Sequence, residues 1–163
     1  MSNTYIDQTA TVHPSANIGE GAKIWNWTKV RENTVIGAET IIGQCCYVDL
    51  DVTIGARCKV QNGVSLYKGL TVGDDVFIGP NATLTNDLTP RAHNLDWTIT
   101  ETNILDGASI GANATIVCGV TLGKHCMVAA GAVVTKDVPD NALVMGAPAR
   151  VVGYVNEDGT KRT

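Results

Sequence analysis

Aliphatic residues recur at every sixth position through most of the chain. Thirteen consecutive hexapeptides carry one, and six more follow after a single interruption. These positions are Val12, Ile18, Ile24, Val30, Ile36, Ile42, Val48, Ile54, Val60, Leu66, Val72, Ile78 and Leu84, and then Ile104, Ile110, Ile116, Leu122, Val128 and Val134. An α-helix with its 3.6-residue turn cannot keep every sixth residue on one face, and a simple strand needs no turn in each unit. The pattern therefore predicts one short strand and one turn per hexapeptide.

A second interior position follows each aliphatic residue by four. It holds mostly small or β-branched residues, including Thr28, Cys46, Cys58 and Cys126, and the same phase also assigns Leu88 to the interior. Glycine often follows the aliphatic residue directly. Since β-branched residues suit strands and glycine suits tight corners, we expect an all-β coil of short strands and turns. The cysteines at this position are interpreted as small apolar fillers.

The hexapeptide phase is lost after Leu88 and returns at Ile104. Because the distance from Leu88 to Ile104 does not fit the six-residue phase, about fourteen residues must leave the coil. The polar sequence between them and Pro90 suit such an excursion. We therefore predict one extruded loop near residues 89–103. Loops that interrupt a regular scaffold are common locations of functional residues.

Composition and charge narrow the class of protein. The chain has 163 residues, enough for one domain, and its net charge of −4 argues against non-specific nucleic-acid binding. The first ten residues lack the apolar core of a secretory signal, and no apolar run has the length of a membrane span. The odd number of five cysteines and the missing signal predict reduced thiols in the cytoplasm. No pair has C-x-x-C spacing, so no zinc or redox site is expected. The three histidines are widely separated, so no metal site is expected, and three tryptophans are too few to suggest a stacking platform.

The long in-phase repeat resembles the hexapeptide-repeat acyltransferases. This resemblance implies a left-handed parallel β-helix with three flat sides, in which three hexapeptides make one coil. Nineteen hexapeptides then correspond to about six coils. We expect a single β-helix domain over residues 1–150, followed by a C-terminal tail over residues 151–163.

The segments GAVVTKDVP and GAPAR resemble the acetyl-CoA-binding end of the acetyltransferase branch. The resemblance implies acetyl-CoA as cosubstrate and a homotrimer in which the pantetheine arm lies along the last coils between two subunits. The small residues Ala112, Ala129 and Ala130 would let this arm approach the backbone. Lys136 and Arg150 are candidates for binding the phosphates of the coenzyme. The alternatives are that Lys136 caps a turn and that Arg150 is a solvated surface charge.

The mouth of the predicted loop reads Thr85-Asn86-Asp87. Sugar O-acetyltransferases among the hexapeptide-repeat acyltransferases, which this sequence resembles, carry a T-H-P motif at the matching position, with the histidine as general base. Deprotonating an alcohol of pKa near 16 at pH 7 would cost about 12 kcal/mol, whereas an amine of pKa about 8 needs only about 1.4 kcal/mol. An amine acceptor mainly needs orientation, which the amide oxygen of Asn86 can provide. The alternative is an O-acetyltransferase in which His93 folds back as the general base.

The longer segment VFIGPNATLTNDLTPRA is similar to nucleotide-sugar 3-N-acetyltransferases, which act on dTDP- or UDP-linked amino sugars. This resemblance implies direct attack of the 3-amino group on the thioester, with no strong protein base. Candidate substrate-binding residues are Tyr67, Lys68, Asp87 and Arg91. Tyr67 and Lys68 are equally well interpreted as a surface turn, and Arg91 either binds a diphosphate or pairs with Asp87 to brace the loop. A non-catalytic assembly module is a further alternative from another class of protein.

Overall fold

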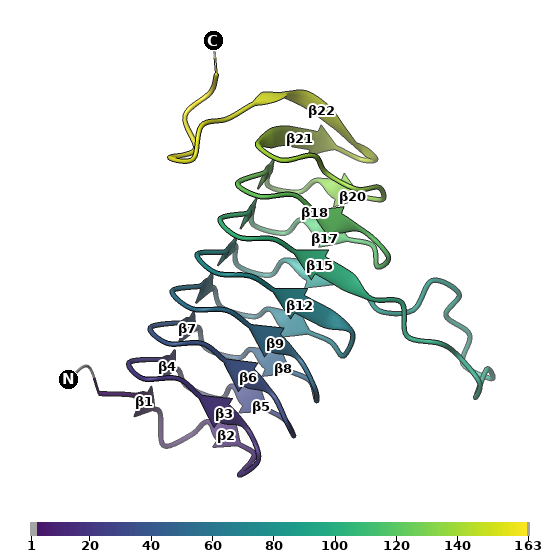
Figure 1. Ribbon diagram of the computed structural model, residues 1–163. Coiled ribbons are helices and arrows are strands. Elements are labelled where there is room, and N and C mark those ends of the chain that lie inside the picture. Colours follow the sequence, from purple (N-terminus) through teal and green to yellow (C-terminus); the bar gives the residue numbers. More distant parts are fainter. Residues whose placement is uncertain (1–2, 163) are drawn as a thin grey trace.

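A computed structural model describes residues 3–162 of the chain. Within these residues the molecule is built from short strands in three sheets, which form the three sides of a prism (Figure 1). Sheet A contains β1 (Tyr5–Ile6), β4 (Lys23–Ile24), β7 (Ile41–Ile42), β10 (Lys59–Val60), β13 (Phe77–Ile78), β16 (Ser109–Ile110), β19 (Met127–Val128), β21 (Ala142–Gly146) and β22 (Ala149–Tyr154). Sheet B contains β2 (Thr11–Val12), β5 (Lys29–Val30), β8 (Tyr47–Val48), β11 (Ser65–Leu66), β14 (Thr83–Leu84), β17 (Thr115–Ile116) and β20 (Val133–Val134). Sheet C contains β3 (Asn17–Ile18), β6 (Val35–Ile36), β9 (Thr53–Ile54), β12 (Leu70–Val72), β15 (Thr102–Ile104) and β18 (Thr121–Leu122).

Strands β1 to β17 each pair in parallel with the strand three further along the chain, so three consecutive strands make one coil of a parallel β-helix. The predicted fold class is therefore confirmed. The prism is longer than the expected six or so coils, because eight parallel strands stack in sheet A. The additional strands are β1, one hexapeptide before Val12, and β21, which follows the last hexapeptide at Val134.

The interior of the prism holds the two residue columns that the repeat predicts. The aliphatic residues from Ile24 to Val134 are at most 2% exposed, and Cys46, Cys58 and Cys126 are also buried. Burial raises the pKa of the Cys126 thiol to about 12, as expected for a packing residue. Thr28 is buried too, but its hydroxyl donates to the carbonyl of Gly43 (2.6 Å) and accepts from the backbone N–H of Cys46 (3.1 Å).

Two-residue corners connect the sides of the prism, and corners of successive coils stack into three columns. We call them corner AB (from sheet A to sheet B), corner BC (from sheet B to sheet C) and corner CA (from sheet C to sheet A). Corner CA comprises residues 20–21, 38–39, 56–57, 74–75, 106–107, 124–125 and 140–141. Corner AB comprises residues 8–9, 26–27, 44–45, 62–63, 80–81, 112–113 and 130–131, and corner BC comprises 14–15, 32–33, 50–51, 68–69, 118–119 and 136–137. The second residue of many corners has a positive φ, even where it is not glycine, as at Cys45 (φ 55) and His125 (φ 54).

The predicted loop leaves the prism at corner BC, between β14 and β15, and extends outward from the coils (Figure 1). Thr71 of β12 pairs with Asn103, an offset of 32 residues, whereas Thr53 pairs with Thr71, an offset of 18; the loop thus adds fourteen residues. Its position is confirmed, but the chain leaves earlier than the phase indicated. Leu88 is 55% exposed rather than interior, because Thr102 of β15 pairs with Leu70 and takes the interior position that the phase assigned to Leu88.

The C-terminal end of the prism is covered by a hairpin. Strand β22 pairs with β21 in antiparallel fashion and lies over the last coil (Figure 1). The expected division at residue 150 falls inside β22, so the first residues after it belong to this hairpin. No helix among residues 3–162 has the length and apolar character needed to cross a membrane.

Candidate functional site

Corner BC brings together predicted residues that are far apart in the sequence. Lys68 is in the corner one coil below the loop, Asn86 is at the start of the loop, and Lys136 is in the same corner two coils above. With strands about 4.8 Å apart along the prism, these residues occupy a column about 15 Å long. The column is the candidate site.

Asn86 is held at the neck of the loop by two hydrogen bonds. Its side-chain amide nitrogen donates to the carbonyl of Lys68 (3.2 Å), and its own carbonyl accepts from the backbone N–H of Thr100 (2.9 Å), which closes the loop. The side chain is half-buried. Its amide oxygen has no hydrogen-bond partner within residues 3–162 and is therefore the acceptor available to a bound ligand.

Lys68 is fixed by carboxylates of the coil below. Its ammonium group pairs with Asp51 (Nζ to Oδ2, 2.8 Å), and its backbone N–H donates to Asp49 (3.2 Å). The hydrogen bond from Lys68 lowers the pKa of Asp51. Because the Lys68 ammonium is already paired, its main contact with the candidate site is the carbonyl that anchors Asn86.

Asp49 is the most densely bonded carboxylate next to the site. Besides Lys68, it accepts from the Tyr47 hydroxyl (3.0 Å), the backbone N–H of Leu50 (2.9 Å) and the Arg31 guanidinium (3.1 Å). Its side chain is only 13% exposed. Burial by itself would raise the pKa of Asp49, but the two backbone N–H groups, the hydroxyl and the guanidinium outweigh it, and the pKa lies below its ordinary value. Asp49 is therefore an ionised structural support of the corner.

Tyr67 precedes Lys68 and projects from sheet B. Its ring lies 6.0 Å from that of Tyr47, tilted by 53°, and it is 38% exposed. One ring edge is thus packed against the prism while the remainder is open to a ligand or a neighbouring subunit.

The other loop residues predicted for the site are less firmly connected to the prism. Asp87 is half-buried and accepts from the backbone N–H of Thr89 (2.8 Å), which bends the start of the loop. Arg91 is exposed and donates to the carbonyl of Pro90 (2.7 Å); within residues 3–162 it does not form the ion pair with Asp87 that would brace the loop. His93 is exposed, and no hydrogen bond within the described residues connects it to Asn86.

The small residues predicted for the coenzyme lie on a different corner. Ala112 and Ala130 are the first residues of two successive turns of corner AB, and Ala129 immediately precedes the second. In some other corners the equivalent backbone N–H donates to an Asn or Asp side chain of the next coil, as from Gln44 to Asn62 (3.1 Å) and from Ala56 to Asp74 (2.8 Å). Within residues 3–162 the N–H groups of Ala112 and Ala130 have no such partner. They are donors that an amide of a bound chain can reach.

Lys136 and Arg150 line one shallow cavity of about 200 Å³ near the C-terminal end of corner BC. Lys136 comes from the corner after β20, and Arg150 comes from β22. Neither forms a salt bridge within residues 3–162, and Arg150 donates only to the carbonyl of Ala149 (2.9 Å). The cavity is also lined by Asp137, whose carboxylate accepts from the backbone N–H of Thr121 (2.7 Å). Two cations against one carboxylate are suited to an anionic group such as a phosphate.

Sequence reasoning did not identify Arg31, Tyr47 and Asp49 as supports of the site. Their spacing in the sequence could have revealed them. Residues 18 apart stack on one another in this fold, and Arg31, Asp49 and Tyr67 are successive members of one such column. Among residues 3–162 no three His, Cys, Asp or Glu side chains are grouped to hold a metal ion.

Comparison with known proteins agrees with the fold and the repeat. The profile of the family described as bacterial transferase hexapeptide (six repeats) matches residues 15–49, 51–86 and 101–136. A prism built from hexapeptide coils places the protein in the hexapeptide-repeat class. The chain belongs to the bacterial transferase hexapeptide family.

Curated relatives include two kinds of acetyltransferase. The chain is 57% identical over 54 residues to dTDP-3-amino-3,6-dideoxy-alpha-D-galactopyranose 3-N-acetyltransferase of Aneurinibacillus thermoaerophilus, which covers 33% of this chain and 28% of the relative. It is 32% identical over 149 residues to galactoside O-acetyltransferase of Escherichia coli, which covers 87% of this chain and 65% of the relative. The chain thus spans less than two thirds of the length of these relatives.

A solved structure of similar fold is that of a mutant of perosamine N-acetyltransferase from Caulobacter crescentus in complex with CoA and GDP-perosamine. The two chains are 27% identical, with a TM-score of 0.58, and the match covers 92% of this chain and 56% of the other.

Proposed function

We propose that the protein is an acetyltransferase that transfers acetyl from acetyl-CoA to the 3-amino group of a dTDP- or UDP-linked amino sugar. The observation that carries this proposal is the Asn86 carboxamide, held by the carbonyl of Lys68 with its oxygen free at the mouth of the loop. Two relatives support the choice of acceptor, because their names describe N-acetyltransferases of nucleotide-linked amino sugars.

In the proposed reaction, the neutral amine attacks the carbonyl carbon of the thioester. A C–N bond forms, the C–S bond breaks, and the thiolate of CoA accepts the proton that the nitrogen loses. The Asn86 oxygen accepts a hydrogen bond from the amine and directs its lone pair toward the thioester. No side chain with a raised basicity is needed, since an amine of pKa about 8 is about one-tenth neutral at pH 7.

The coenzyme would contact both corners described above. Lys136 and Arg150 would bind its phosphates at corner BC, while the free N–H groups of Ala112 and Ala130 at corner AB would bind the amides of the pantetheine arm. Corners AB and BC border the same sheet, sheet B. In a homotrimer with sheet B facing the threefold axis, corner AB of one subunit meets corner BC of the next, so the complete site would lie between two subunits.

The experiment is an assay of acetyl-CoA consumption with matched sugars that differ only in the acceptor group. Nucleotide-linked 3-amino sugars should be acetylated, and the corresponding 3-hydroxy sugars should not. Equal turnover of amino and hydroxy sugars would refute the role given to Asn86. Sedimentation analysis should give a trimer, and a fully active monomer would refute the shared site.

A second candidate is sugar O-acetylation with His93 as general base, which the similarity to galactoside O-acetyltransferase favours. It requires the exposed His93 to reach the acceptor. His93→Ala should then abolish the activity while Asn86→Ala preserves it, which is the reverse of the result expected for N-acetylation.

A further inference from the structure

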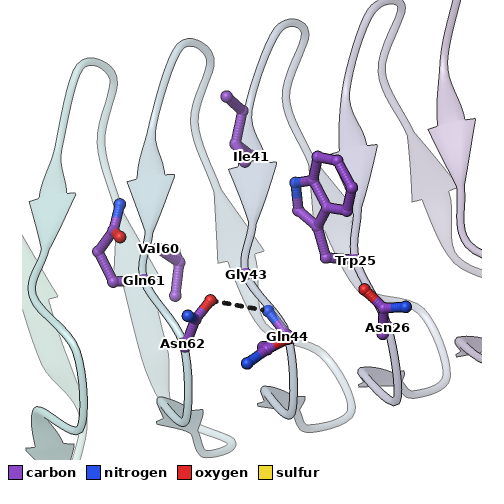
Figure 2. Close-up of a pocket in the computed structure, with 8 residues that line it drawn as sticks. All are labelled: Trp25, Asn26, Ile41, Gly43, Gln44, Val60, Gln61 and Asn62. Carbon is purple, nitrogen blue, oxygen red and sulfur yellow. Dashed lines mark hydrogen bonds between the residues drawn. The ribbon is translucent and has the colours of Figure 1, made fainter.

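A polar cavity of about 370 Å³ lies on sheet A and corner AB, away from the loop and its neck. Three successive coils form it, and its walls are carboxamides and an indole (Figure 2). The lining residues are Trp25, Asn26, Ile41, Gly43, Gln44, Val60, Gln61 and Asn62. No charged side chain is among them, so the cavity suits the uncharged part of a ligand.

Gly43 lines the cavity, and the backbone of the next coil approaches it closely. A Cβ atom there would lie 2.5 Å from the side-chain oxygen of Asn62 and 2.8 Å from its backbone nitrogen. Any larger residue would therefore collide with Asn62 of the next coil and displace it. The same Asn62 oxygen accepts from the backbone N–H of Gln44 (3.1 Å), which fixes one carboxamide in place (Figure 2).

The remaining hydrogen-bonding groups of the cavity are free. Within residues 3–162 the side-chain amides of Asn26, Gln44 and Gln61 form no hydrogen bond. Each offers a donor and an acceptor to a ligand. Since they belong to adjacent coils, they are spaced along the prism at intervals of about 4.8 Å.

Trp25 supplies an aromatic wall. Its indole is 40% exposed, and its other side packs on Tyr5 with ring centroids 5.3 Å apart and an angle of 54° between the planes. The indole is thus supported while part of it remains open. Figure 2 shows Trp25 on the coil next to the one that carries Ile41 and Gly43. A flat ring with donors and acceptors on its edge fits between such a wall and the carboxamides.

We infer that this cavity binds the pyrimidine base of the nucleotide-linked substrate. The imide edge of thymine or uracil alternates acceptor, donor and acceptor, which free carboxamides can match, and the base has a face to stack on Trp25. The inference rests on the proposed function, which supplies a nucleotide-linked sugar. A free sugar ring is less well matched, because its hydroxyl groups project to all sides whereas the carboxamides line one wall.

The position of the cavity is consistent with the proposed assembly. It lies on corner AB one to three coils below the level of Asn86, on the side that would face corner BC of the neighbouring subunit. The base would then enter from the N-terminal coils and the coenzyme from the C-terminal coils. The acceptor nitrogen would meet the thioester between them, at the loop.

The test is equilibrium binding of dTDP and UDP to the full-length protein in the absence of CoA. Trp25→Leu should weaken binding about tenfold or more through lost stacking, and Gln61→Ala about fivefold through a lost hydrogen bond. Asn17→Ala removes an exposed carboxamide from sheet C and is the matched control, with unchanged binding expected. Melting temperatures identify any variant that is not folded.

Binding of dTDP and UDP that is unaffected by both cavity variants would overturn the inference, as would equally tight binding of a neutral methyl glycoside. Because binding is measured without acetyl transfer, this result is distinguishable from failure of the proposed function. Asn86→Ala provides the reciprocal case, since it should leave dTDP and UDP binding intact while acetyl transfer falls.

Discussion

Replacement of Asn86 by alanine separates the structural and chemical roles of its carboxamide. The amide nitrogen holds the carbonyl of Lys68 at 3.2 Å, and a neutral hydrogen bond of this kind contributes about 0.5–1.5 kcal/mol to the free energy of unfolding. For a domain of this size, about 1 kcal/mol corresponds to about 2–4 °C in melting temperature. Asn86→Ala should therefore lower the melting temperature by only a few degrees.

The effect on acetyl transfer should be larger. In the transition state the attacking nitrogen gains positive charge, and a hydrogen bond to a charged group is worth about 1.5–3 kcal/mol. At about 1.36 kcal/mol per factor of ten, its loss predicts a fall in kcat/KM of about ten- to 150-fold. The measurement is the initial rate of CoA release with a dTDP-linked 3-amino sugar at pH 7, alongside thermal unfolding of the same preparations.

Two further variants make the result specific. Asn86→Asp keeps an acceptor oxygen but loses the donor to Lys68, so kcat/KM should fall less than in the alanine variant while the melting temperature falls at least as much. His93→Ala should leave kcat/KM within about threefold of the parent protein. A loss below about threefold in Asn86→Ala, combined with a large loss in His93→Ala, would refute the reasoning.

Three other outcomes are expected. Lys136→Ala and Arg150→Ala should each raise the Kd for CoA about fivefold at low salt and less at high salt, because both cations are exposed; titration calorimetry checks this, and salt-independent affinity would contradict it. The pKa of Asp49 is lowered in the folded protein, so the ionised carboxylate stabilises the fold fully above its unfolded pKa of about 3.9. This stabilisation is lost as the pH falls through the lower pKa of the folded state. Asp49→Asn should therefore show a smaller loss of unfolding free energy below about pH 4 in denaturant titrations. Ile78→Ala should cost about 2–5 kcal/mol in the free energy of unfolding, since Ile78 is fully buried, whereas Phe77→Ala at the adjacent, 38% exposed position should cost much less; equal costs would place the core incorrectly.

The sequence predicted the interior of this protein almost residue by residue. In a coil of hexapeptides, one residue column must be aliphatic and a second must be small, and this requirement identifies Cys46 and Cys58 as interior residues without further information. The prediction that Leu88 is interior was wrong, because the repeat phase and hydrophobicity alone do not show where a chain leaves the coil. That is decided by the strand that follows, and β15 starts only at Thr102.

The candidate site was less predictable because its parts are joined by stacking between coils and not by proximity in the sequence. Lys68 and Asn86 could be proposed from a resemblance, but their contact through the Lys68 carbonyl depends on the path of the loop neck. Trp25 was discounted because the chain has few tryptophans. The role inferred for it depends on the carboxamides of three coils beside it, which a count of aromatic residues does not detect.

The loop inserts fourteen residues at a corner, yet β12 and β15 pair in register as if nothing separated them. Neither the neighbouring rungs nor the packing beneath them needs to adjust to what the insertion contains. If the proposed function holds, its length and composition can therefore change with the acceptor while the rest of the scaffold stays as it is. Transplanting the segment between Thr85 and Thr102 into another protein of this architecture should carry acceptor preference with it and leave the recipient's thermal stability largely as it was.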